Sequence, residues 1–334
     1  MSQGDIDQNQ AAETSTTASI NPASIAQHKG WLGLGVALGV AGSVTLAFGA
    51  TCYQLSQALI RPRLKRLSQL KSPHLRHLLK QRHIHFDDVT FASFDGTRLY
   101  GWWMAKDAAR PTVVLLHGVK KNRTDVLRGA LVLCEAGFNV LIFDGRGHGD
   151  SGGRFVTYGF FERRDVESAI DWLVEHKRID RQRIGIAGES MGAAIALQVA
   201  AHNSWVRAVW ADSPFASLRR VSAEFLERVT HLPGSLLNPV VWTTIQVANY
   251  RGKFNVLAVD PLALAAKITC PVYLVHGTAD QLISPAHSQN IHEALGGEKF
   301  LWLIEGARHA RGVRHAKQHY AERLVNFFTE KLND

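Results

Sequence analysis

The segment Gly188–Gly192 places Ser190 between two glycines, at a spacing that suits nucleophilic catalysis. It follows an apolar run that ends at Ala187 and precedes an Ala-rich stretch typical of a helix. A serine on a sharp strand-to-helix turn exposes its hydroxyl, and the positions two before and two after it must lack side chains. The helix N-terminus that follows offers backbone N–H groups to a developing negative charge. Gly188 and Gly192 therefore indicate a nucleophile elbow around Ser190 rather than an ordinary glycine-flanked turn.

A serine hydroxyl needs a general base, and His309 is the candidate among the sixteen histidines. It lies in the loop after the last predicted strand, at the carboxyl edge of the sheet where Ser190 also emerges. The base needs a carboxylate that fixes its tautomer. Asp280, one strand earlier, gives the expected chain order of Ser, Asp and His. Asp212, after the preceding strand, is the alternative acid, although its Asp-Ser-Pro context favours a helix-entry cap.

Two backbone N–H groups are needed to bind the oxygen that becomes negative during acyl transfer. We expect one from Met191, directly after the nucleophile, and one from Val119, in the loop after the first parallel strand. Gly118 lets the backbone of that loop come close to a substrate. His117 and His276 each end a strand before a glycine, which favours a role in shaping backbone turns.

Alternating strands and helices must position these residues. A hairpin around Asp95-Gly96 comes first, and short apolar runs separated by helical stretches follow it, which predicts a mostly parallel sheet with helices on both faces. About 55 residues separate Asp212 from Thr269, too many for a plain crossover. We interpret residues 214–268 as a small helical cap. Its apolar residues include Phe215, Phe225, Leu226, Leu232, Leu236, Leu237 and Trp242.

The chain from about Phe86 to Phe328 resembles the α/β-hydrolase family. The matching pieces are Leu115–Gly118, Asp144–Gly149, Glu162 with Asp165, Gly188–Gly192, Asp212–Pro214, Pro271–Asp280 and Gly306–His309. The resemblance implies the α/β-hydrolase fold, a serine hydrolase activity, and a structural turn at residues 144–151. Lys120-Lys121-Asn122 departs from the small residues that often follow the His-Gly pair, which bears on how a substrate approaches.

The N-terminal part of the sequence has the pattern of a membrane anchor. We expect a disordered tail over 1–28, one transmembrane helix over 29–55, a basic neck over 56–86 and the hydrolase domain over 87–334. Trp31 to Tyr53 carry no charge and make about 34 Å of helix, enough to cross a hydrocarbon core of roughly 30 Å. A cleaved signal peptide and a buried core helix are the alternatives, and the length of the run opposes both.

The net charge of +9 is local, because residues 60–86 hold eight Lys or Arg and no acid. Beside an apolar run, such a cluster favours anionic lipids over nucleic acid, and it predicts a cytoplasmic catalytic domain. Three cysteines without metal spacing imply no metal, and nothing in the sequence implies a cofactor.

The sequence thus predicts a membrane-anchored serine hydrolase that cleaves acyl esters or thioesters through an acyl-enzyme on Ser190. Its expected partners are a small or lipid-like acyl substrate and membrane lipids. A serine peptidase of the same fold and a non-catalytic α/β-hydrolase-like binding protein are the alternatives.

Overall fold

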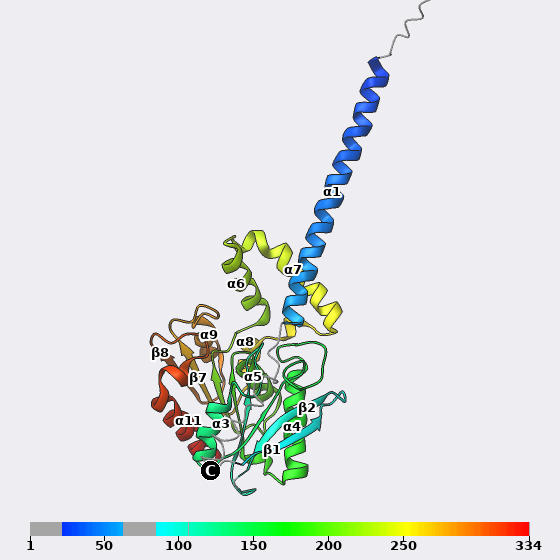
Figure 1. Ribbon diagram of the computed structural model, residues 1–334. Coiled ribbons are helices and arrows are strands. Elements are labelled where there is room, and N and C mark those ends of the chain that lie inside the picture. Colours follow the sequence, from blue (N-terminus) through cyan, green and yellow to red (C-terminus); the bar gives the residue numbers. More distant parts are fainter. Residues whose placement is uncertain (1–21, 63–84, 106, 334) are drawn as a thin grey trace, which may run out of the picture. The chain divides into compact units, whose positions relative to one another are not determined.

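One mixed eight-stranded sheet organises the part of the chain that carries the candidate residues (Figure 1). The structure is a computed structural model that describes residues 22–62, 85–105 and 107–333, with side chains from residue 41 onward. The chain divides into two units, Met1–Ala50 and Thr51–Asp334. The strands, in chain order, are β1 Asp87–Ala92, β2 Arg98–Met104, β3 Thr112–Leu116, β4 Asn139–Phe143, β5 Ile184–Glu189, β6 Ala208–Asp212, β7 Val272–Gly277 and β8 Lys299–Ile304.

The spatial order of the strands is β1-β2-β4-β3-β5-β6-β7-β8. β1, β2 and β4 pair antiparallel with one another in turn, and all later pairs are parallel. Every residue of the central strands β3, β4 and β6 is buried, as expected for continuous apolar runs covered on both faces. In the edge strand β1, buried and exposed residues instead alternate over the central positions. The predicted hairpin and mostly parallel sheet are confirmed.

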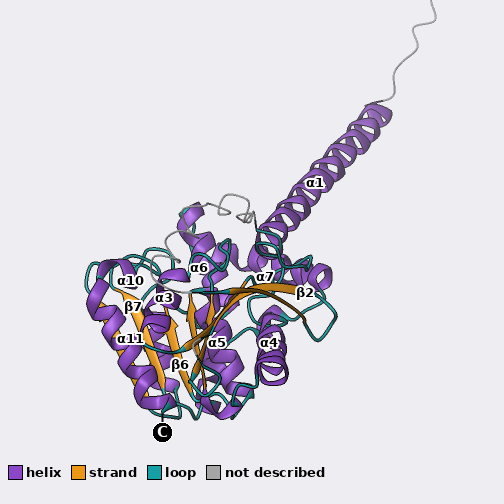
Figure 2. Cartoon of the chain, turned by 60° about the horizontal axis from the view of Figure 1, so that its bottom comes forward, coloured by secondary structure: helices purple, strands orange, loops and turns teal. Residues whose placement is uncertain are grey.

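Helices cover both faces of the sheet (Figure 2). One apolar core includes residues of α4 and α5, and the other includes residues of α3 and α11. The α-helices are α1 Pro22–Ile60, α3 Leu127–Glu135, α4 Glu162–Lys177, α5 Met191–His202, α6 Leu218–Thr230, α7 Gly234–Gly252, α8 Pro261–Leu264, α9 Ala286–Ala294, α10 Gly312–His315 and α11 Lys317–Leu332. Short 3-10 turns are η2 Arg181–Arg183, η3 Val256–Ala258 and η4 Ala265–Lys267.

The long connection between β6 and β7 folds into the helices α6 and α7, with α8 and two short turns after them. Residues of α7, together with Phe215 and Leu218, form a third apolar core above the sheet. Leu237, Val241 and Ile245 contribute one side of α7 to it. The segment interpreted as a cap is therefore helical, and it shares this apolar core with Ile60 of α1 and Ala194 of α5.

The last ten residues of α1 belong to the same compact unit as the sheet. Ile60 is completely buried in the cap core. Its carbonyl accepts a hydrogen bond from Val156 N at 2.9 Å, and the Leu59 carbonyl accepts one from Tyr158 Oη at 3.0 Å. Arg251 of α7 donates to Ser56 Oγ at 2.8 Å. Residues 51–60, assigned from the sequence to the anchor and the neck, thus complete the hydrolase unit.

Among the residues that the structure describes, no helix is long and apolar enough to cross a membrane. The transmembrane helix predicted from the sequence is 29–55, and the side chains of residues 22–40 lie outside that description. α1 begins at Pro22, inside the segment expected to be a disordered tail. Residues 1–21 and most of the predicted neck, 63–84, also lie outside the described residues.

Candidate active site

Ser190 lies on a strained turn between β5 and α5. Its backbone has φ 55° and ψ −114°, which a non-glycine residue rarely adopts. A Cβ atom on Gly188 would lie 2.3 Å from the backbone of Gly192, and a Cβ atom on Gly192 would lie 2.2 Å from the Leu116 carbonyl oxygen. Ser190 N donates to the Asp212 carbonyl at 2.8 Å, which fixes the turn against β6. The local geometry is thus that of the predicted elbow.

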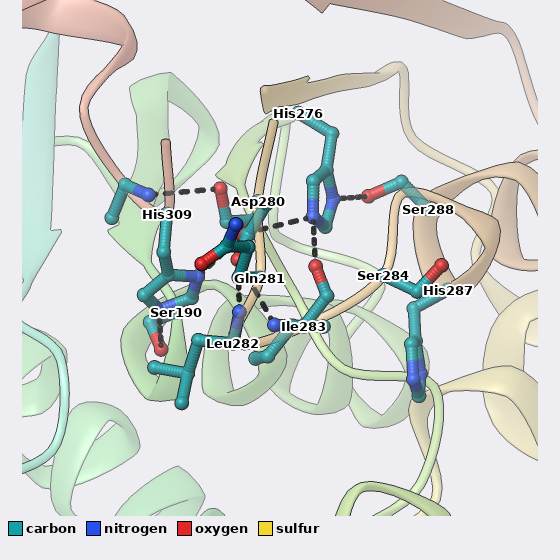
Figure 3. A network of polar contacts seen from close by, with 12 residues as sticks. Ser190, His276, Asp280, Gln281, Leu282, Ile283, Ser284, His287, Ser288 and His309 are labelled. Carbon is teal, nitrogen blue, oxygen red and sulfur yellow. Dashed lines mark hydrogen bonds and ion pairs between the residues drawn. The ribbon is translucent and has the colours of Figure 1, made fainter. Parts of the chain in front are cut away.

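Three side chains from separate loops meet at this turn (Figure 3). Ser190 Oγ donates to His309 Nε2 at 2.9 Å, and His309 Nδ1 donates to Asp280 Oδ2 at 2.6 Å. The loop after β7 carries Asp280 and the loop after β8 carries His309, and both strands run parallel to β5. The structure therefore brings together the three residues that the sequence named as nucleophile, base and acid.

Asp280 is held by more than His309. Its other carboxylate oxygen accepts hydrogen bonds from Leu282 N at 2.8 Å and Ile283 N at 3.0 Å. Burial opposes ionisation, but hydrogen bonds from His276 and His309 outweigh it and hold the pKa of the Asp280 carboxyl well below its ordinary range. Asp280 is thus an anion at any pH at which His309 could act as a base.

His276 contributes to the site in a way that the sequence did not indicate. Its Nε2 lies 3.1 Å from Asp280 Oδ2 and 3.0 Å from the Ile283 carbonyl oxygen, so this nitrogen must carry a proton. Its Nδ1 accepts from Ser288 Oγ at 2.7 Å. His276 therefore positions Asp280, and it does not only shape a turn. The spacing of four residues could have indicated the contact with Asp280, whereas nothing in the sequence pointed to Ser288.

Asp212, the alternative acid, has other partners. Its carboxylate accepts from Ser213 Oγ at 2.8 Å and from Tyr320 Oη at 3.0 Å. Tyr320 in turn accepts from Trp210 Nε1 at 2.8 Å. The helix-entry cap expected of Asp212 is wrong, because Ser217 caps α6 and the Asp212 side chain binds buried hydroxyls instead.

The two candidate oxyanion donors border the same cavity as Ser190. Within the described part of the chain, neither Val119 N nor Met191 N donates a hydrogen bond to another protein atom. Met191 is the first residue of α5, so its N–H also lies at the positive end of the helix dipole. A Cβ atom on Gly118 would lie 3.4 Å from Ser190 Cβ, so this loop does approach the nucleophile closely.

Two buried histidines support the loop that carries Val119. His117 Nδ1 donates to the Gly118 carbonyl at 2.8 Å, and its Nε2 accepts from Gly145 N at 2.9 Å. Burial lowers the pKa of His117 to about 4, so the ring is neutral at physiological pH. His148 Nε2 accepts from Lys120 N at 3.3 Å. The turn at residues 144–151 thus acts structurally, as the resemblance implied.

A cavity of about 540 Å3 opens beside Ser190 and His309. Its apolar wall comes from the cap helices and from Leu55 and Leu59 of α1. Phe225 lines the cavity, whereas Trp242, named beside it among the apolar residues of the cap, does not line the cavity and is 66% exposed. In the described residues no cluster of His, Cys, Asp or Glu side chains could hold a metal ion.

The sheet, the cap and the Ser-His-Asp arrangement define a serine hydrolase with the α/β-hydrolase fold. The model of the prolyl oligopeptidase family matches residues 126–334, and the chain belongs to this family. The chain is similar to YqkD of Bacillus subtilis, an uncharacterised protein, with 33% identity over 245 residues that cover 72% of this chain and 77% of YqkD.

Solved structures share the fold. The Pyrococcus furiosus esterase Pf2001 has 26% identity and a TM-score of 0.63, covering 76% of this chain and 96% of that chain. The Pyrococcus horikoshii acylaminoacyl peptidase has 17% identity and a TM-score of 0.59, covering 77% of this chain and 43% of that chain. The second likeness shows the fold alone.

Proposed function

We propose that this chain is a membrane-anchored hydrolase that cleaves acyl esters or thioesters through an acyl-enzyme on Ser190. The observation that carries the proposal is the hydrogen-bonded series Ser190–His309–Asp280, which opens into an apolar cavity. The volume of the cavity lies in the range of about 300–1,000 Å3 that is usual for small-molecule sites.

The first half-reaction follows from the positions of the protons. Ser190 Oγ attacks the acyl carbonyl carbon while His309 Nε2 takes the hydroxyl proton. Asp280 accepts the hydrogen bond from Nδ1 and stabilises the imidazolium that forms. Val119 N and Met191 N bind the developing oxyanion. His309 then gives its proton to the leaving oxygen or sulfur, and the acyl group stays on Ser190.

The second half-reaction repeats these roles with water. His309 removes a proton from a water molecule, which attacks the acyl carbon. The tetrahedral oxyanion forms again between the two backbone N–H groups. Its collapse breaks the bond to Ser190 Oγ, which regains a proton from His309, and the carboxylic acid leaves.

Two observations favour an ester or thioester over a peptide bond. The wall that faces Ser190 is formed largely by aliphatic and aromatic side chains of α6, α7 and the end of α1. The match to the esterase Pf2001 covers 96% of that protein and 76% of this chain. Membership of the prolyl oligopeptidase family supports a serine peptidase as the second candidate.

The membrane part of the proposal rests on the N-terminal unit and on the charges that follow it. Val44, Leu46 and Phe48 of α1 are exposed, by 63%, 76% and 38%, although all three are large and apolar. Eight Lys or Arg residues follow within 60–86. An apolar helix with a basic flank is the pattern expected of a span that ends at the cytoplasmic leaflet.

The test is turnover of p-nitrophenyl esters by the full chain in detergent, together with labelling by a fluorophosphonate. Ser190→Ala or His309→Ala alone is expected to lower kcat at least about a thousandfold, and the double variant to lose little more, because the two residues act as a unit. Ser190→Ala also loses the label.

Ser222→Ala is the matched control, because Ser222 lines the same cavity but, among the described residues, makes no hydrogen bond to His309. Far-UV circular dichroism checks the fold of each variant. A folded Ser190→Ala protein that keeps its label and its rate would end the assignment of the nucleophile.

A further inference from the structure

The cavity beside Ser190 has two chemically different sides. The cap and the end of α1 supply the apolar side. The loop after β3 supplies Lys120 and Lys121, and the segment after β8 supplies Arg311 and Arg314, all four of which line the cavity. Lys120 and Lys121 stand where small residues often follow the His-Gly pair in the α/β-hydrolase family. Four cationic side chains therefore line the same cavity as the apolar side chains of the cap and of α1.

Two acidic side chains, Asp125 and Glu189, line the same side. Asp125 pairs with Lys121 at 2.9 Å. Burial and the nearby Asp212 raise the pKa of Glu189 to about 8, so this carboxyl is mostly neutral at pH 7. Among the described residues, Lys120, Arg311 and Arg314 have no ion-pair partner within 4.0 Å. The side carries an excess of positive charge.

The position of His309 shows which part of a substrate would meet these cations. His309 must lie beside the leaving group, because it returns the proton to that atom. Arg311 and Arg314 follow His309 by two and five residues and line the same cavity. Lys121 Cγ lies within 3.8 Å of a Cβ atom built on Gly118, which itself approaches Ser190. Arg311 and Arg314 therefore lie on the same segment as the residue that must face the leaving group, and Lys121 lies on the loop that approaches the nucleophile.

We infer that the substrate is an acyl chain joined to an anionic, phosphate-bearing leaving group, with the chain in the apolar side of the cavity and the phosphate among Lys120, Arg311 and Arg314. Guanidinium groups bind phosphate by paired, charge-assisted hydrogen bonds. A cleft lined by one sign of charge also concentrates substrates of the opposite sign. This inference rests on the proposed acyl hydrolase activity.

The test compares substrates that differ in the phosphate and share an octanoyl chain. One pair is 1-octanoylglycerol and 1-octanoylglycerol 3-phosphate, which represents an oxygen ester of lipid type. The other is octanoyl-pantetheine and octanoyl-4′-phosphopantetheine, which represents a thioester of a phosphorylated carrier. The quantity measured is the selectivity ratio, kcat/KM of the phosphate-bearing compound divided by kcat/KM of its neutral partner. A ratio from one preparation does not depend on the fraction of folded enzyme.

The full chain is expected to show a ratio of about tenfold or more in at least one pair, and the pair that shows it identifies the source of the phosphate. Arg311→Gln combined with Arg314→Gln is expected to lower that ratio about tenfold, and 0.5 M NaCl to reduce it as well. Arg308→Gln is the matched control, because Arg308 is exposed in the same segment but does not line the cavity. Its ratio is expected to match that of the wild type.

A ratio near one in both pairs, with neutral esters still hydrolysed, overturns the phosphate inference and leaves the proposed hydrolase activity intact. A ratio that survives the double substitution overturns the assignment to these arginines. Failure to hydrolyse any of the four compounds overturns both proposals.

Discussion

At the scale of single residues, the acid of the triad is decided by contacts and not by chain order. Asp280 and Asp212 both follow strands at the same edge of the sheet, and both lie close enough to affect the electrostatics of the site. Only Asp280 has a hydrogen bond to His309. The Asp212 carboxylate instead binds two hydroxyl groups, and burial raises its pKa.

These contacts predict different effects of the same substitution. Asp280→Asn is expected to lower kcat by roughly 10³- to 10⁴-fold, because an amide stabilises the wrong tautomer of His309. Asp212→Asn is expected to cost less than about tenfold, since the amide oxygen can still accept from Ser213. Steady-state turnover of a p-nitrophenyl ester measures both. A larger loss in Asp212→Asn, with both variants folded, would transfer the role of the acid to Asp212.

Ionisation of Glu189 is expected to make the activity of the site depend on pH. Its pKa of about 8 means that it loses a proton as the pH rises past 8, which places a negative charge beside the nucleophile and the oxyanion donors. We expect kcat/KM of the wild type to fall above about pH 8. Glu189→Gln should keep its activity into this range, because the amide does not ionise.

Profiles of kcat/KM between pH 6 and 10 on a neutral ester test this effect. Glu305→Gln serves as the control, because Glu305 is exposed and does not line the cavity. The same alkaline decline in the Glu189→Gln enzyme would assign the ionisation to another group.

The positions of Ser190, His309 and Asp280 could be predicted from the sequence, because each follows a strand and parallel strands end at one edge. The elbow was also predictable, because only glycine fits at 188 and 192. The hydrogen bond from Ser288 to His276, which positions Asp280, could not be predicted, since it depends on how α9 packs beside β7. The exposure of Trp242 could not be predicted either, because an apolar residue of a cap helix can lie on the buried or on the exposed side of that helix.

At the scale of elements, α1 belongs to two parts of the molecule. The uncharged run in the sequence predicts a helix, but the length of the run cannot show at which residue the helix begins to pack against the hydrolase unit. Cys52, Ser56 and Ile60 are completely buried in the hydrolase unit, whereas residues 41–51 are exposed. The spacing of these three residues, four apart, is the helical period of one buried face.

A fragment of residues 87–334 is therefore expected to be less stable than one of residues 51–334. Burial of Ile60 alone is worth about 1.5–3 kcal/mol, and a domain of this size loses roughly 2–4 °C of Tm per kcal/mol. A decrease in Tm of about 5 °C or more is expected by calorimetry. The shorter fragment also lacks Leu55 and Leu59, so its preference for octanoyl over acetyl esters should weaken. Equal Tm and equal chain-length preference in the two fragments would contradict this role of α1.

At the scale of the whole molecule, the charges on either side of the uncharged run Trp31–Tyr53 predict the orientation. The segment before the apolar run has three acids and Lys29, and eight Lys or Arg residues follow it within 60–86. Positive charge within about 20 residues of a span holds that side in the cytoplasm. We therefore expect the catalytic unit in the cytoplasm.

Reporters fused after Asp334 test this orientation. A reporter active only in the cytoplasm should give signal, and one active only after export should not. Replacing the Lys and Arg residues of 61–66 by Gln is expected to weaken the bias. Signal from the exported reporter alone would reverse the proposed topology.

The packing of the end of α1 against the cap has a consequence for proteolysis. A single cut between residues 63 and 84 breaks the covalent link between α1 and the sheet. It leaves Ile60 in its apolar core, and it leaves the hydrogen bonds of Leu59, Ile60 and Ser56 in place. The nicked protein then consists of two complementing fragments held by packing. Release of the larger fragment would require the two fragments to dissociate, and the released fragment would lack Leu55 and Leu59, which line the cavity beside Ser190.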